Sequence, residues 1–235
     1  MDSVRINKYL ADRGVCSRRE ADKLVAEGKI TIDGQVAVMG QKVTGTETIE
    51  VHGKPITINK PTRVYIVYNK PVGIICSTDP KAKDNIVDAV GYPERIFNIG
   101  RLDVASSGLI LLTNDGDIVN KILRAEGKHE KEYVVTVGHK ITPDFLHKMS
   151  KGVLLEDDDK KTLPARVEQI SDKTFKIILV EGRNRQIRRM CEGLGYSVDS
   201  LERIRIMNIK LGKLRIGEWR HLTETEEKEL MDTLV

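Results

Sequence analysis

The stretch that decides the fold of this 235-residue chain is GRLDVASSGLILLTNDG, at residues 100–116. It begins with a polar segment, which is followed directly by the apolar residues 109–112 and then by the turn-forming residues 114–116. A short aliphatic run bounded by turn residues is typical of a buried strand. We therefore expect a core strand with a polar loop at its start.

Two charged side chains, Arg101 and Asp103, flank Leu102 in that loop. A carboxylate beside a core strand and near an arginine is a candidate catalytic group, because burial and a neighbouring positive charge can tune it. A structural ion pair that caps the loop fits the same pattern and is the commoner case. The stretch alone therefore nominates Asp103 without assigning it a role.

The segments around this strand predict an α+β fold. Apolar and alternating patterns predict strands at residues 64–68, 74–77, 96–99, 109–113, 133–137, 165–170, 175–180 and 203–211. Helical spacing predicts helices at residues 86–90, 118–123, 143–149 and 185–194, and a last helix that starts at Thr223. Because helices do not follow every strand, we expect a mixed, mainly antiparallel sheet with peripheral helices.

The first 60 residues have a pattern of their own. Two short helices are expected, the second capped by Ser17, and Asp33-Gly34 between alternating runs predicts a hairpin. A further strand is expected at residues 56–58, and the polar, proline-containing residues 59–63 predict a linker. We therefore expect two domains, residues 1–60 and residues 64–235, both of ordinary size.

Composition excludes several classes of protein. Apolar residues make up 40% and charged residues 31%, which is typical of a globular chain. The three cysteines form no CxxC pair, so neither a disulfide framework nor a zinc site is expected. With no secretory leader and no apolar run near membrane-spanning length, a cytoplasmic enzyme or binding protein is the expectation. The net charge of +4 permits a nucleic-acid partner without demonstrating one.

A second charged feature is VEGRNRQIRRMC, at residues 180–191, where four arginines fall within seven positions. On a helix, Arg185, Arg188 and Arg189 would share one face, opposite an apolar face. Arginine is suited to phosphate, and like charges this close repel one another. We expect a phosphate-contacting ridge, with a solvated basic face as the alternative.

Four segments in order are more specific than any one of them: KPVG at residues 70–73, the stretch at 100–116, KEY at 131–133 and GRNRQIRRM at 182–190. Together they resemble the RsuA-type family of RNA pseudouridine synthases. RINKYLA at residues 5–11, CSRREAD at 16–22 and ITIDG at 30–34 resemble an S4 RNA-binding domain. HEKEY at residues 129–133 and the tail from residue 201 to 220 are most similar to the RluF branch, which acts on 23S ribosomal RNA.

The resemblance implies roles for individual residues. Asp103 matches the catalytic aspartate, and Tyr133 the aromatic residue that stacks on the target base. Arg188 matches the basic residue that pairs with the catalytic carboxylate. Arg101 matches the arginine that helps to take the place of the flipped base. The usual threonine of the motif is Ser106 here, which keeps the hydroxyl group.

The resemblance also implies RNA contacts and a reaction without cofactor or metal. Basic and polar residues of both domains are the expected RNA contacts: Arg101, Lys70, Arg183, Arg185, Gln186, Arg189, Arg5, Lys8, Arg18 and Arg19. Without the family context, the KPVG segment that contains Lys70 predicts only a turn.

The expected function is isomerisation of a uridine in ribosomal RNA, 23S by resemblance, by a monomer without membrane association. A 16S or transfer RNA target stays open, and so does an inactive S4-type RNA-binding protein. A glycosidase would need a pair of carboxylates, and only one acidic residue stands out. Taking a base out of its stack costs a few kcal/mol, which a basic grip and an aromatic platform can offset.

Overall fold

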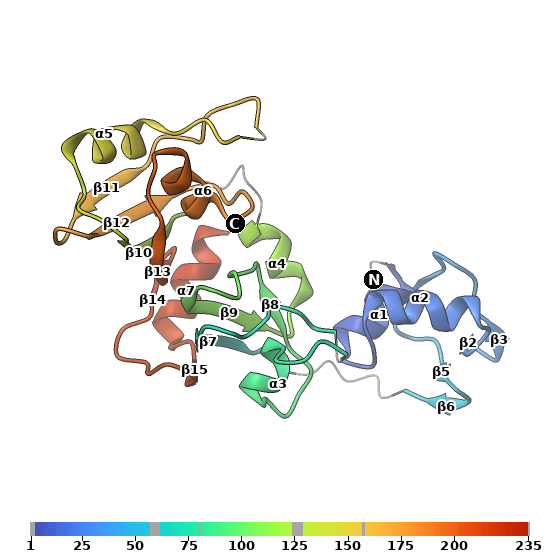
Figure 1. Cartoon of the computed structure of the whole chain (residues 1–235). Helices are drawn as coiled ribbons and strands as arrows, with labels where there is room; N and C mark the ends of the chain where they lie inside the picture. The colour runs from blue at the N-terminus through green and yellow to red at the C-terminus, as the bar shows by residue number, and fades with distance from the viewer. Residues whose placement is uncertain (1–2, 57–61, 80, 124–128, 157, 235) are drawn as a thin grey trace. The chain divides into compact units, whose positions relative to one another are not determined.

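The computed structural model describes residues 3–56, 62–79, 81–123, 129–156 and 158–234 (Figure 1). The chain forms two compact units. Unit one is Met1–Val64 with Pro93–Arg95 and Asn114–Gly116, and unit two is the remainder. The predicted linker at residues 59–63 lies mostly outside the described residues. No helix in the described ranges is long and apolar enough to cross a membrane.

Unit one is a small helix-and-sheet domain. Its elements are β1 (Val4–Arg5), α1 (Ile6–Asp12), α2 (Arg18–Ala26), β2 (Ile30–Ile32), β3 (Gln35–Val36), β4 (Lys42–Val43), β5 (Ile49–Val51) and β6 (Lys54–Pro55). The Ser17 hydroxyl accepts a hydrogen bond from the backbone of Glu20, which caps α2. Asp33 and Gly34 both have positive φ, as the β2–β3 hairpin turn requires. The two predicted helices and the hairpin are confirmed, whereas the expected strand at residues 56–58 falls largely outside the described residues.

Unit two is built on one large sheet. Its strands are β7 (Tyr65–Lys70), β8 (Phe97–Ile99), β9 (Ser107–Thr113), β10 (Lys131–Val137), β11 (Arg166–Gln169), β12 (Thr174–Leu179), β13 (Val198–Ile206), β14 (Ile209–Lys210) and β15 (Trp219–His221). Their order is β11-β12-β10-β13-β9-β7-β15, with β14 beside β13 and β8 beside β9. Within the described residues, β9 and β13 run parallel and the other pairs antiparallel. This confirms the predicted mixed, mainly antiparallel sheet.

One row of the sheet register brings distant parts of the sequence together. Lys70 on β7 lies opposite Gly108 on β9, and Gly108 lies beside Arg203 on β13. Arg203 in turn lies opposite Tyr133 on β10. The loop that carries Asp103 enters β9 at this row, so the strand pairing itself places these residues near one another.

Gly108 is required at this row because the neighbouring strand comes very close. Its φ is +105°, and a Cβ placed there would lie 2.3 Å from the backbone oxygen of Arg203. Such a contact is impossible without moving a strand, so the glycine that begins the apolar run fixes how β9 and β13 meet.

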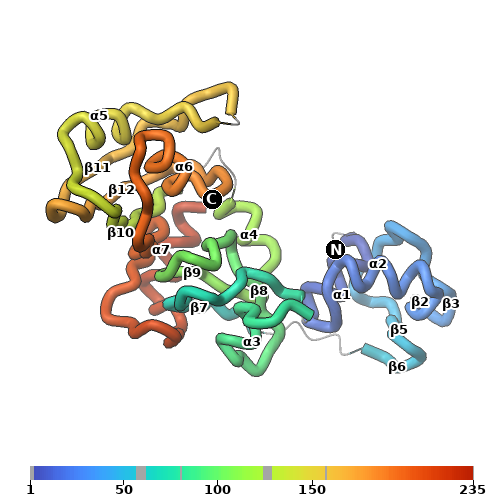
Figure 2. Tube along the Cα trace, viewed as in Figure 1, coloured from blue at the N-terminus to red at the C-terminus, as the bar shows by residue number. Residues whose placement is uncertain are grey.

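Peripheral helices cover the sheet in two groups. α5 (Pro143–Lys151) and α6 (Gln186–Gly193) share a core with β10 and β12, which includes Val135, Phe175 and Met190. α4 (Gly116–Leu123) and α7 (Glu224–Thr233) bury a second core, which includes Leu111 and Leu230. Each such side chain contributes about 1.5–3 kcal/mol when fully buried. Figure 2 follows the chain from β12 through α6, which leads into β13.

Two strand predictions were wrong. Residues 74–77 form a loop with a single bridge between Ile75 and Asn85. The Lys70 ammonium group donates to the Pro71 and Ile74 carbonyls, which holds this segment in a turn after β7 instead of an extended strand. The strand expected at residues 203–211 is a hairpin instead: β13 begins earlier, at Val198, and a turn at Met207, with φ of 51°, leads into β14. The predicted helices of this unit, including α3 (Ile86–Val90), are confirmed.

Candidate active site

A pocket of about 480 Å³ lies in unit two, beside the loop that carries Asp103. Its walls come from this loop, from β10 and β13, and from the segment that begins α6. Four residues to which the resemblance gave roles in the reaction line it together: Arg101, Asp103, Tyr133 and Arg188. The fold therefore gathers in one place residues that are up to 87 positions apart in the sequence.

The loop around Asp103 is held by backbone and thiol contacts. The backbone NH of Ser106 donates to the Asp103 carbonyl at 3.0 Å, and that of Gly73 donates to the Val104 carbonyl at 2.9 Å. The Cys76 thiol donates to the Leu102 carbonyl at 3.2 Å. Burial raises the pKa of this thiol, so it stays a neutral donor. Asp103 itself is half-buried, at the wall of the pocket.

Arg188 holds the same loop but does not form the expected ion pair with Asp103. Its Nη2 donates to the Ala105 carbonyl at 2.8 Å and to the Ser106 hydroxyl at 3.2 Å, and its Nη1 donates to the Val198 carbonyl at 3.3 Å. No Asp103 oxygen comes within 4.0 Å of it in the part of the chain that the structure describes. The expected pairing is thus corrected: from its place on α6, the guanidinium group reaches the loop backbone and its serine.

Tyr133 lies on β10 in the pocket wall, with 9% of its surface exposed. The guanidinium carbon of Arg203 lies 6.0 Å from the centre of its ring, at the limit of cation–π range. Lys131, two residues earlier on the same face of the strand, also lines the pocket and donates to the His129 carbonyl. Burial and the charge of Arg203 lower the pKa of this lysine.

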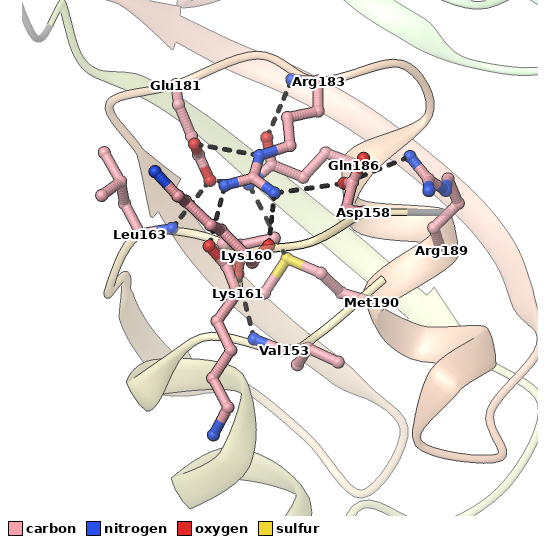
Figure 3. A network of polar contacts seen from close by, with 11 residues as sticks. Val153, Asp158, Lys160, Lys161, Leu163, Glu181, Arg183, Gln186, Arg189 and Met190 are labelled. Carbon is pink, nitrogen blue, oxygen red and sulfur yellow. Dashed lines mark hydrogen bonds and ion pairs between the residues drawn. The ribbon is translucent and has the colours of Figure 1, made fainter. Parts of the chain in front are cut away.

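Arg183 is held in a network of acidic groups and carbonyls, drawn in Figure 3. It pairs with Asp158 at 3.1 Å and with Glu181 at 3.3 Å, and it donates to the carbonyls of Lys160 and Lys161. The hydrogen bond to Asp158 raises the pKa of this guanidinium group. These contacts argue against the predicted RNA contact by Arg183.

Gln186 belongs to the same network. Its Nε2 donates to Glu181 at 2.8 Å, and its Oε1 accepts from the backbone of Arg183 at 3.0 Å. The side chain is buried. These contacts argue against the predicted RNA contact by Gln186, because its amide is engaged at the turn that begins α6.

Lys70 is also inside the protein rather than at its surface. It is fully buried, and its Nζ donates to two backbone carbonyls at 2.8 and 2.9 Å. Burial lowers its pKa, and the charge of Arg203 acts in the same direction, while the charge of Asp103 opposes both. This geometry argues against an RNA contact by Lys70, whose charge instead closes the turn that follows β7.

The remaining arginines of the cluster differ in exposure. The side chain of Arg185 is 55% exposed, lines the pocket and lies 3.8 Å from Glu192. Its backbone is left-handed, with φ of 46°, where it begins α6. Arg189 is less exposed and lies 3.7 Å from Asp158. Of the four clustered arginines, Arg185 is thus the well-exposed one at the pocket.

The basic residues predicted in unit one lie on its two helices and at their start. Arg5, Arg18 and Arg19 are exposed, so they can reach a partner. Lys8 is half-buried and lies 4.0 Å from Asp12.

Two pocket residues were missed from the sequence, Lys131 and Arg203. The KEY segment held a signal for Lys131, because residues two apart on a strand share a face. Arg203 carried no such signal, since its predicted strand began at Arg203 itself and its partner strand was unknown. Only the observed register places it between Gly108 and Tyr133.

Comparison with known proteins supports one assignment. The model of the RNA pseudouridylate synthase family matches residues 64–193, more than half of the chain, and the S4 domain model matches residues 4–49. The dual-specificity RNA pseudouridine synthase RluF of Escherichia coli is 49% identical over 226 residues, which covers 95% of this chain and 77% of that protein. The ribosomal large subunit pseudouridine synthase B of Bacillus subtilis is 39% identical, with 96% and 95% covered.

A solved structure agrees. A crystal structure of a pseudouridylate synthase superposes with a TM-score of 0.70 at 30% identity, and covers 99% of this chain and all of that one. The resemblance drawn from the motifs is confirmed by these matches. The chain therefore belongs to the RNA pseudouridylate synthase family, with an S4 domain before its synthase domain, and it is a pseudouridine synthase.

Proposed function

We propose that this enzyme isomerises a uridine of 23S ribosomal RNA and that Asp103 is its catalytic residue. The observation that carries the proposal is the meeting of Asp103, Tyr133 and buried cationic groups in one pocket. The reaction breaks the N1–C1′ bond and forms a C5–C1′ bond. The uracil loses a proton from C5 and gains one at N1, so no group leaves.

The pocket supplies what this reaction needs from a protein. The uridine has to leave its stack to reach Asp103, at a cost of a few kcal/mol, and contact with the Tyr133 ring offsets part of that cost. Asp103 acts at the ribose or at the uracil ring, and three routes are open: attack at the sugar, attack at the ring, or elimination to a glycal. Arg101, an exposed residue of the pocket lining, is our candidate to fill the space that the flipped base leaves.

The charge of the pocket favours an RNA substrate. Six basic side chains line it, from Arg101, Lys131, Arg183, Arg185, Arg188 and Arg203, against the two acidic ones of Asp103 and Glu181. Glu181 is already bound to Arg183, Gln186 and the backbone of Leu163. The surplus positive charge attracts the phosphates on either side of the target.

The names of the relatives support the choice of RNA. The Bacillus subtilis relative is named for the large ribosomal subunit, which favours 23S over 16S RNA. The Escherichia coli relative is named as dual-specific, so a second RNA class, with transfer RNA as our candidate, belongs to the proposal.

We assign the RNA grip to residues 1–60, with Arg5, Arg18 and Arg19 as its exposed contacts, and catalysis to residues 64–235. In this proposal the enzyme acts as a monomer in the cytoplasm.

The proposal is tested by mapping pseudouridines across ribosomal and transfer RNA in cells with and without the protein. We expect a 23S site to be lost without it, restored by the wild-type chain and not by Asp103→Asn. Unchanged 23S maps, or rescue by Asp103→Asn, would overturn the proposal. Rescue by that variant would also favour the RNA-binding alternative, in which the chain acts without catalysis.

A further inference from the structure

Arg203 is a buried arginine of the pocket wall to which neither the motifs nor the family resemblance gave a role. Its side chain belongs to β13 and is 4% exposed. Few arginines are buried this deeply unless they are paired, because removing a charge from water is expensive. What Arg203 contacts therefore bears on what the pocket does.

Arg203 bonds to the backbone on both sides of Asp103. Its Nε donates to the Leu109 carbonyl at 2.7 Å, and its Nη1 donates to the Arg101 carbonyl at 3.4 Å. The first carbonyl follows the loop and the second precedes Asp103 by two residues. One rigid guanidinium group thus ties together both ends of the loop that carries Asp103.

The strand that carries Arg203 cannot easily shift. Its backbone packs so closely on Gly108 that a Cβ there would lie 2.3 Å from the Arg203 oxygen. On its other side, Arg203 is paired in register with Tyr133. The position of the guanidinium group is therefore fixed relative to the loop and to the aromatic ring.

Arg203 also keeps its positive charge unneutralised. Its Nη2 is buried and has no hydrogen-bond partner, and within the described ranges no carboxylate lies within 4.0 Å of the group. Its charge helps to lower the pKa of Lys70, which is buried, and of Lys131, which is half-buried. Asp103 is the acidic residue of the pocket that is not bound into the Arg183 network.

We propose that Arg203 is a positioning residue of the isomerisation: it holds the loop in the shape that presents Asp103 to the uridine, and its unpaired charge in the pocket wall is left to stabilise negative charge that develops in the reaction. This inference rests on the catalytic role proposed for Asp103. In this proposal two arginines hold the loop, Arg188 at its middle and Arg203 at its ends, whereas the family resemblance singled out Arg188 alone.

The test compares three variants on 23S RNA purified from cells that lack the protein. We expect Arg203→Met to lower kcat roughly 10- to 100-fold, while KM and RNA affinity stay within about twofold of wild type. Arg203→Lys keeps the charge but cannot reach both carbonyls, so its kcat should lie between those of the wild type and Arg203→Met. If Arg203→Met does not fold, the lysine variant carries the test, with a kcat loss at unchanged KM as the required result.

Arg205→Met is the matched control, because Arg205 is a poorly exposed arginine of the same strand that is bound to Glu130 and Glu132, outside the pocket. It should lower the melting temperature and leave kcat unchanged. The inference is overturned if Arg203→Met keeps kcat within twofold, if its loss appears in KM instead, or if Arg205→Met loses as much kcat. An active Asp103→Asn variant would defeat the proposed function instead, which separates the two failures.

Discussion

Arg183 and Arg203 line the same pocket but are held in opposite ways. Arg183 is bound to the carboxylates of Asp158 and Glu181 as well as to carbonyls (Figure 3). Arg203 is bound to carbonyls alone, and so is Arg188 apart from the Ser106 hydroxyl. An arginine paired with carboxylates contributes order without net charge, whereas one bound to neutral groups contributes order and leaves its charge to the pocket.

We propose that this difference separates structural from functional arginines, also within the cluster at residues 180–191. A charge-assisted hydrogen bond is about twice as strong as a neutral one, so both kinds of contact hold their surroundings firmly. Only the carbonyl-bound arginines can still attract an anion or stabilise one that forms. We therefore expect Arg183 variants to lose stability and Arg188 variants to lose activity.

The largest contrast should come from Arg188→Met against Arg183→Met. Arg188 donates to two groups of the loop that carries Asp103, and each bond from a charged donor is worth about 1.5–3 kcal/mol. We expect kcat to fall roughly 100-fold or more in Arg188→Met. Arg183→Met should instead lose about 1–3 kcal/mol of unfolding free energy, with kcat unchanged below its melting temperature. Urea unfolding measures the stability of both variants, and single-turnover assays measure their kcat. Equal kcat losses in the two variants would contradict the distinction between carboxylate-bound and carbonyl-bound arginines.

The next effect concerns the wall that Arg203 supports. Tyr133→Ala removes the aromatic platform, and stacking on a base is worth about 1–3 kcal/mol, or roughly 5- to 150-fold in kcat/KM. Tyr133→Phe keeps the ring and should stay near wild type. A phenylalanine variant as poor as the alanine variant would show that the hydroxyl group matters and the ring face does not.

A smaller effect is expected at the exposed end of the arginine cluster. Arg185→Ala should weaken RNA binding a few-fold and lower the slope of log Kd against log salt by about 1. Arg183→Met, measured beside it, should leave that slope unchanged. Equal changes in slope would mean that carboxylate-bound Arg183 also reaches phosphate.

The smallest effect lies away from the pocket, at the pair of Arg220 and Glu226. Two hydrogen bonds of 2.6 and 2.8 Å join them, and Glu226 also caps α7. The bonds from Arg220 lower the pKa of Glu226, so the folded protein gains stability above the unfolded pKa of about 4.3. This gain is lost as the pH falls through the lowered folded pKa.

Glu226→Gln should therefore cost about 1 kcal/mol of unfolding free energy at pH 7, and the difference from wild type should shrink as the pH falls below about 4.3 and through the lowered folded pKa. Pseudouridine formation should be unchanged, because this carboxylate-bound arginine lies outside the pocket. Unfolding curves measured from pH 7 down into the acid range provide the measurement, and a cost that does not fall with the pH would contradict the ion-pair origin of the effect.

Local pattern predicted much of the fold, because caps, turns and periodicity act over a few residues. Ser17, the Asp33-Gly34 turn and the helix at residues 224–233 follow from such signals. Asp103 and Tyr133 could be nominated because their motifs are short and contiguous, and the structure places both in the wall of one pocket. What failed depends on long-range contacts: burial of Lys70 needs the loop that it closes, and the partners of Arg183 lie about 20 residues earlier in the chain.

Arg203 shows the same limit most clearly. Its importance comes from a parallel pairing with Gly108, 95 positions earlier, and no local pattern encodes which strands become neighbours. Sequence spacing placed three of the four clustered arginines on one helix face, whereas their partners on other elements divide the cluster into neutralised and unneutralised charges.

The central claim is that Asp103 performs the chemistry in a pocket whose loop is held by carbonyl-bound arginines. Its most direct test is Asp103→Asn, a nearly isosteric change, measured by single-turnover pseudouridine formation on 23S RNA together with RNA affinity and melting temperature. The account predicts no detectable pseudouridine, with affinity and melting temperature close to wild type. Pseudouridine formation within a few-fold of wild type would contradict it.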